Sequence, residues 1–124
     1  MTVVALVVTY NRRDLLMGCL EGVFGQSRPP DRVFLVDNAS TDGTPELLRE
    51  RGFLDRPELT YLRLAENLGS SGGFAEGVRA AREPESDWLW LMDDDSQAEP
   101  DTLERLLAAA AAADTGTVAL CAKV

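Results

Sequence analysis

The stretch Trp88-Leu89-Trp90-Leu91-Met92-Asp93-Asp94-Asp95 places three adjacent carboxylates directly after five consecutive apolar residues. An apolar run of this length is typical of a strand buried on both faces, as in a parallel sheet. The aspartates then lie where that strand leaves the core. Adjacent carboxylates repel each other, and Mg²⁺ or Mn²⁺ is a natural counter-charge because these hard cations prefer oxygen ligands. The alternative interpretation is an acidic surface loop ahead of the next helix.

Apolar runs alternate with helical patterns on both sides of this stretch. Further strands are expected at residues 3–8, 33–36, 59–64 and 117–122, and helical patterns at 15–23, from 44 to near 52, at 74–81 and from 100 onward. Asn11 and Thr44 are the expected N-caps of the first two helices, and residues 69–73 are expected to form a flexible turn. The alternation predicts an α/β fold, with a mainly parallel sheet and helices on both faces, in one domain over residues 1–124.

Polar clusters follow three of the predicted strands: Thr9-Tyr10-Asn11, Asp37-Asn38-Ala39-Ser40 and the three aspartates. We expect them to share one crevice, since ligands of such sheets bind beyond the carboxyl ends of the strands. The first cluster offers hydroxyls, an amide and a ring to a base or ribose, although Asn11 also suits helix capping. A carboxylate at Asp37 suits a pyrimidine N3–H, with an Asx-type turn as the alternative.

A glycine-rich run, residues 66–73, precedes the third helical pattern. Its backbone N–H groups are candidates for phosphate or sugar oxygens, but it matches neither the dinucleotide fingerprint nor the P-loop. Arg12, Arg13 and Arg63 are candidates for pyrophosphate contact, with solvated surface positions as the alternative.

Composition excludes several classes of function. The net charge of −9 argues against nucleic-acid binding, and the absence of histidine excludes catalysis by histidine. Cys19 and Cys121 fit no metal spacing and are expected to be buried, reduced thiols of a cytosolic protein. No segment is long enough to span a membrane, and no signal peptide is recognisable. We therefore expect a cytoplasmic protein, with its full-length form at the cytoplasmic face of a membrane as a further expectation.

Four segments together resemble the N-terminal half of an inverting family 2 glycosyltransferase with the GT-A fold. They are residues 7–12, residues 36–44, Asn67-Leu68-Gly69 with Gly72-Gly73, and Met92-Asp93-Asp94-Asp95, in the order and spacing of that family. The paired glycines and the triple aspartate look most similar to its bacterial rhamnosyltransferase and galactofuranosyltransferase branch, which acts on cell-envelope polysaccharides.

The resemblance implies a UDP- or dTDP-sugar donor, a saccharide or lipid-linked saccharide acceptor, and Mn²⁺ or Mg²⁺ as cofactor. By resemblance, Asp95 would be the chief metal ligand, with Asp93 as a second ligand that also contacts the donor. The donor- and nucleotide-binding residues implied are Thr9, Tyr10, Asn11, Arg13, Asp37, Asn38, Ser40, Asn67, Gly69, Gly73, Asp93 and Asp94.

The family's general base lies on the acceptor-binding half, downstream of the triple aspartate. We therefore expect residues 1–124 to be a nucleotide-sugar-binding subdomain cut before that half, and inactive alone. The alternatives are a non-catalytic nucleotide-sugar-binding module and a sugar nucleotidyltransferase. A phosphatase with an aspartate nucleophile is disfavoured, since its Asp-x-Asp motif follows an early strand.

Overall fold

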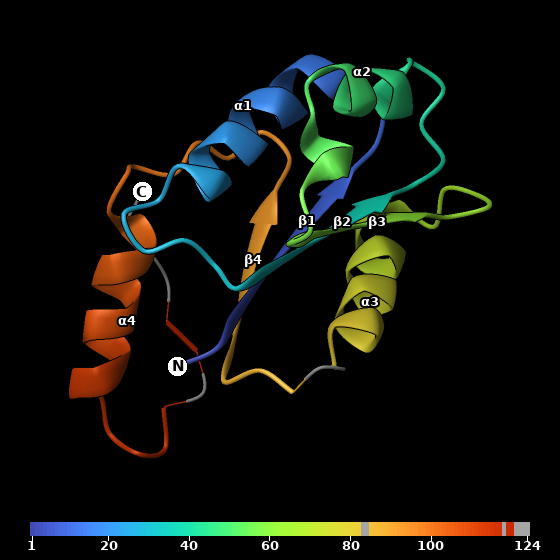
Figure 1. Cartoon of the computed structure of the whole chain (residues 1–124). Coiled ribbons are helices and arrows are strands. Elements are labelled where there is room, and N and C mark those ends of the chain that lie inside the picture. Colours follow the sequence, from blue (N-terminus) through green and yellow to red (C-terminus); the bar gives the residue numbers. More distant parts are fainter. Residues whose placement is uncertain (83–84, 118, 121–124) are drawn as a thin grey trace.

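A computed structural model describes residues 1–82, 85–117 and 119–120 (Figure 1). Four strands form one sheet in the order β3-β2-β1-β4, and all three strand pairs are parallel. The elements are β1 (Val3–Thr9), α1 (Arg13–Phe24), β2 (Arg32–Asp37), α2 (Thr44–Glu50), the 3₁₀ helix η1 (Phe53–Asp55), β3 (Leu59–Arg63), α3 (Gly69–Ala81), β4 (Trp88–Asp93) and α4 (Thr102–Ala112). The predicted α/β class is confirmed.

The strand register brings the polar clusters to one edge of the sheet. Thr9 pairs with Asp37 across β1 and β2, and Val8 pairs with Asp93 across β1 and β4. Because parallel strands end at the same edge, the side chains that follow β1, β2 and β4 are neighbours.

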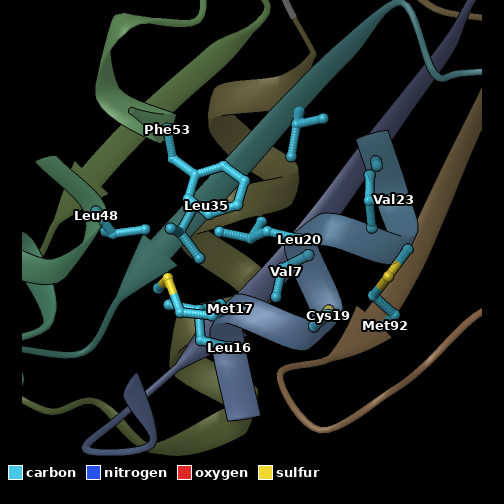
Figure 2. Packing of buried hydrophobic residues seen from close by; sticks show 12 residues of the cluster. Val7, Leu16, Met17, Cys19, Leu20, Val23, Leu35, Leu48, Phe53 and Met92 are labelled. Carbon is cyan, nitrogen blue, oxygen red and sulfur yellow. The ribbon is translucent and has the colours of Figure 1, made fainter. Parts of the chain in front are cut away.

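Two apolar cores lie on opposite faces of the sheet, so the predicted helices on both faces are confirmed. On one face, α1, α2 and η1 cover alternate residues of β1 and β2, and Figure 2 shows Leu20 of α1 beside Val7 and Leu35. On the other face, α3 covers Leu6 and Val36. Each fully buried leucine or valine contributes about 1.5–3 kcal/mol to the free energy of folding.

The strand β4 differs from its prediction. Only Met92 is buried, and Leu91 is half-exposed, so the expected burial on both faces is wrong. The physical reason is the strand order, which places β4 at the margin of the sheet that the structure describes.

The glycine-rich segment also differs, because residues 69–73 form the first turns of α3 rather than a flexible turn. Glycine is a poor helix former, so tertiary packing stabilises this helix. A Cβ atom on Gly73 would lie 2.6 Å from Cγ1 of Val8, and one on Gly77 would overlap Leu6. The glycines therefore let α3 approach the sheet closely.

Both predicted N-caps are wrong. Arg12 precedes α1 and Gly43 precedes α2, and neither helix has a side-chain cap from that position. The side chain of Asn11 instead bonds to Thr41, while Thr44 is the first residue of α2. Helix α4 begins two residues after Pro100.

Of the strand predicted at residues 117–122, residues 118, 121 and 122 lie outside the described residues, and the described residues 117, 119 and 120 are not in a strand. Cys19 is buried and free, as predicted, while Cys121 lies outside the described residues. Among the helices that the structure describes, none has both the length and the apolar character needed to cross a membrane.

Candidate functional site

A crevice of about 520 Å³ opens beyond the carboxyl ends of the strands. All three predicted polar clusters contribute to it, so their expected convergence is confirmed. Its walls also include the start of α3. The lining residues are Val8, Thr9, Tyr10, Arg12, Asn38, Asn67, Gly69, Ser70, Asp93, Asp94 and Asp95.

The three aspartates occupy two different environments. Asp94 is buried, and its Oδ2 accepts a hydrogen bond from the Thr9 hydroxyl at 2.8 Å. Asp93 and Asp95 are exposed on either side of it. The middle carboxylate therefore joins the ends of β1 and β4, while the outer two remain available to a ligand.

The triplet creates a strongly negative field. Cys19 lies in the adjacent core, with its Sγ 3.6 Å from the Asp93 carbonyl oxygen. Burial, together with the negative charges of the three aspartates, raises the pKa of the Cys19 thiol to about 12. A cation entering the crevice would relieve this field.

Among the described residues that line the crevice, Arg12 is the basic one. Its Nη1 lies 3.4 Å from Oδ1 of Asp94 and 3.5 Å from Oδ2 of Asp95. The guanidinium thus partly neutralises the triplet from the side of the loop between β1 and α1.

That loop is fixed by the loop between β2 and α2. The backbone N–H of Asn11 donates to Oγ of Ser40 at 3.0 Å, and its side-chain Oδ1 accepts from the N–H of Thr41 at 2.7 Å. The backbone N–H of Arg13 donates to Asp42 at 3.2 Å. Asn11 has φ +48°, a left-handed conformation that these contacts maintain.

Asp37 is fully buried and its carboxylate is engaged. Oδ1 accepts from the N–H of Ser40 at 2.8 Å, and Oδ2 accepts from the Tyr61 hydroxyl and from Arg63, whose Nη1 lies at 3.1 Å. Burial and the bond to Asp37 raise the pKa of Tyr61. Arg63 also donates to the Ser40 carbonyl oxygen at 2.7 Å. This network holds the turn after β2.

Asn38 connects that turn to the start of α3. Its Oδ1 accepts from the N–H of Leu68 at 3.2 Å, and its Nδ2 donates to the Gly69 carbonyl oxygen at 3.1 Å. Asn67 accepts from the N–H of Gly69 at 2.8 Å. The first residues of α3 are therefore fixed opposite the aspartates.

A buried glutamine connects α1 to α4. Nε2 of Gln26 donates to the carbonyl oxygens of Gly22 and Glu99, and its Oε1 accepts from the N–H of Leu103. The chain that follows the aspartates is thereby held against the end of α1.

The structure brings most of the predicted site residues to the crevice, but not all. Those in its wall are Thr9, Tyr10, Asn38, Asn67, Gly69, Asp93, Asp94 and Asp95. Those placed outside the wall are Asn11, Arg13, Asp37, Ser40 and Gly73, which support the loops or pack beneath them. Their contact with a ligand stays a prediction.

Sequence reasoning underrated Arg12 and missed Val8 and Ser70. Arg12 is one of three candidates for pyrophosphate contact, but the predicted donor-binding residues include Arg13 and not Arg12, whereas the structure places Arg12 in the crevice wall and Arg13 outside it. Ser70 lies in the glycine-rich run, directly after the glycine that begins α3, and this position is the sequence signal that could have indicated it as a crevice residue.

Asp93 and Asp95 are the crevice residues that could hold a divalent cation. Within the described residues, no three carboxylate or thiol groups converge on one point, so an all-protein cage is absent there. Asp93 and Asp95 instead offer exposed oxygens, which suit Mg²⁺ or Mn²⁺ held by one or two carboxylates and completed by substrate phosphates.

A parallel α/β sheet with a crevice beyond its strand ends belongs to the open α/β architectures, which bind their ligands at that edge. Residues 4–123 match the family described as Glycosyl transferase family 2. The chain belongs to this family, which confirms the resemblance read from its motifs.

Individual proteins are also similar to this chain in sequence and in structure. The chain is 42% identical over 109 residues to galactofuranosyltransferase GlfT1 of Mycolicibacterium smegmatis, covering 87% of this chain and 35% of that protein. The mannosyltransferase PcManGT of Pyrobaculum calidifontis, solved with GDP-Man and Mn²⁺, superposes with a TM-score of 0.71 at 31% identity, over 85% of this chain and 31% of that one. Residues 1–349 of S. aureus TarS, solved with UDP, superpose with a TM-score of 0.69 at 25% identity, over 87% of this chain and 31% of that one. The chain thus spans about a third of the length of these relatives.

Proposed function

We propose that this chain is the donor-binding part of a metal-dependent, inverting glycosyltransferase. The observation that carries the proposal is the pair of exposed carboxylates, Asp93 and Asp95, in the same crevice as Tyr10 and the start of α3. One wall offers metal ligands, and the others offer a ring and backbone N–H groups for a nucleotide. The crevice volume of about 520 Å³ suits a small-molecule ligand.

The proposed donor is a UDP-sugar, with a dTDP-sugar as the alternative. Binding of UDP by TarS supports uracil, and the similarity to GlfT1 favours galactofuranose over rhamnose as the sugar. PcManGT was solved with GDP-Man, so guanosine diphosphate is the necessary comparison in any binding test.

Asp93 and Asp95 would hold Mn²⁺ or Mg²⁺. The bound cation would supply neutralisation of the charge that develops on the departing diphosphate. The carboxylate of Asp94, held by Thr9, would keep its two neighbours aimed into the crevice. The Asn38 clamp would keep the first turn of α3 in place for the donor.

Inversion requires an acceptor hydroxyl to attack the anomeric carbon from the face opposite the diphosphate, assisted by a general base. We propose that this base lies in a part of the protein corresponding to the length of the relatives that this chain does not span. The proposed acceptor is a cell-envelope polysaccharide or a lipid-linked saccharide, and the proposed location is the cytoplasm, at the membrane face.

The test is calorimetric titration with uridine, thymidine and guanosine diphosphates, in Mn²⁺ and in chelator. Saturable binding of uridine diphosphate that requires Mn²⁺ is the expected result. The same titration is then repeated on the full-length protein, because the chain spans only about a third of the length of its relatives. If the full-length protein binds none of the three in Mn²⁺, the proposal is wrong.

A further inference from the structure

The basic residue of the crevice contacts two of its three carboxylates. Nη1 of Arg12 reaches Asp94 at 3.4 Å and Asp95 at 3.5 Å. Asp94 is already bonded to Thr9. Asp95 is half-exposed, and among the described residues its ion-pair partner is Arg12. In this structure Arg12 is therefore the positive group that balances the charge of Asp95.

The backbone of Arg12 is held by hydrogen bonds on both sides, while its side chain reaches toward solvent. The preceding Asn11 is anchored to Ser40 and Thr41, and the Arg12 carbonyl oxygen accepts the N–H of Leu16 in the first turn of α1. The Arg12 side chain itself is about half-exposed. Such a side chain can exchange partners without any movement of the fold.

A divalent cation held by Asp95 would compete with the Arg12 guanidinium for that carboxylate, of which Arg12 contacts Oδ2. Two positive groups on one carboxylate repel each other, so a cation held by Asp95 would favour departure of Arg12. A diphosphate offers the released guanidinium a new partner, because the planar fork of arginine matches phosphate oxygens.

We propose that Arg12 is an exchangeable counter-charge, which holds Asp95 in the metal-free crevice and turns to the donor diphosphate when the cation takes Asp95. This inference rests on the proposed function and adds a donor-binding residue to it. Arg12 would disfavour metal binding alone and favour binding of metal together with diphosphate. The crevice would thereby be selective for the complete metal–donor complex.

The test measures two affinities of the full-length protein: Mn²⁺ alone by electron paramagnetic resonance, and uridine diphosphate in saturating Mn²⁺ by calorimetry. In Arg12→Gln, Mn²⁺ alone is expected to bind about five-fold more tightly, because the competing charge is gone. Uridine diphosphate is expected to bind about ten-fold more weakly, through loss of a charged hydrogen bond. A purely structural role would not produce these opposite changes.

Two controls separate position from total charge. Arg105→Gln removes an equal charge from the exposed surface of α4, where the residue pairs with Asp101, and is expected to leave both affinities unchanged. Arg12→Lys keeps the charge without the planar fork. It is expected to bind Mn²⁺ as weakly as the unaltered protein does, but to recover only part of the diphosphate affinity.

The inference is overturned if Arg12→Gln matches Arg105→Gln in both affinities while the unaltered protein binds the metal and the diphosphate. It is also overturned if both affinities fall together. Failure of the proposed function gives a different result, in which the unaltered, folded protein itself binds no diphosphate in Mn²⁺.

Discussion

The Thr9 hydroxyl donates a hydrogen bond to Asp94 across 85 residues of sequence, at 2.8 Å, and both side chains are buried. This bond ties the end of β1 to the chain leaving β4. It also divides the acidic triplet by role: all three aspartates line the crevice, but the middle carboxylate is buried and bonded to Thr9, whereas the outer two are exposed. Three identical residues in a row therefore have different consequences when substituted.

Replacing Thr9 by valine is expected to lower the free energy of unfolding by about 1–3 kcal/mol, because a buried carboxylate loses a donor. Thr9→Ser keeps the hydroxyl and is the matched control, expected to retain most of the stability. Urea denaturation at pH 7 measures both variants. Equal stability of the valine variant and the unaltered protein would show that the bond contributes nothing to the fold.

Asp95→Ala is expected to abolish the dependence of uridine diphosphate binding on Mn²⁺, because Asp95 is the exposed ligand proposed for the cation. Asp55→Ala removes an equal charge from the exposed end of η1 and should leave the Mn²⁺ dependence intact. Calorimetry in Mn²⁺ and in chelator compares the two variants. If uridine diphosphate binding by the Asp95 variant still depends on Mn²⁺ to the same extent, the cation is held by a residue other than Asp95.

Asp37→Asn tests the predicted contact with a pyrimidine base. If the carboxylate meets the base, uridine diphosphate affinity should fall about ten-fold while adenosine diphosphate affinity changes little, since a charged hydrogen bond is lost only with the former. Tyr61→Phe is the comparison, because it removes one donor to Asp37 but keeps the carboxylate. Equal losses for both nucleotides would show that Asp37 acts only by holding the turn through Ser40.

The fold and the convergence of the site followed from simple patterns, while the details depended on contacts between distant segments. Alternating strand and helix signals predict a parallel sheet, and a parallel sheet brings strand ends together. Local pattern could not show that Asp37 is enclosed by Tyr61 and Arg63, or that Arg12 rather than Arg13 faces the aspartates. Those outcomes depend on which loops meet.

The expected turn at residues 69–73 shows the same limit. Glycine content favours a turn locally, yet close packing against Val8 and Leu6 makes glycine the residue that lets α3 form there. The expected burial of β4 failed for a related reason, because apolar content does not reveal whether a strand is central or marginal.

Asp31 gives the fold a predictable dependence on pH. A hydrogen bond from the N–H of Val3 lowers the pKa of Asp31, and Arg28 adds to the effect. A lowered folded-state pKa means that the stabilisation is present above the unfolded value of about 3.9 and is lost as the pH falls through the folded value. Asp31→Asn should therefore reduce stability at pH 7 but not at pH 2.

The effect should be modest, no more than about 1 kcal/mol, because the Asp31 side chain is nearly half-exposed and solvent screens it. Urea denaturation at pH 7 and pH 2 gives the difference, with Asp55→Asn as the charge-matched control. A stability loss in Asp31→Asn that is the same at both values would assign the effect to packing rather than to ionisation.

Gly73→Ala and Gly22→Ala form a matched pair of helix substitutions with opposite expected signs. A Cβ on Gly73 would lie 2.6 Å from Val8 and 2.9 Å from Nδ2 of Asn38, whereas one on Gly22 would meet only ordinary contacts at 3.5 Å or more. Gly73→Ala should therefore cost about 1–3 kcal/mol through overpacking, and Gly22→Ala should gain up to about 1 kcal/mol from helix propensity. Because Asn38 clamps Leu68 and Gly69, Gly73→Ala should also weaken diphosphate binding. Denaturation and calorimetry together test this coupling: a stable Gly73→Ala variant with unchanged affinity would mean that α3 has room to move away from the sheet without disturbing the crevice.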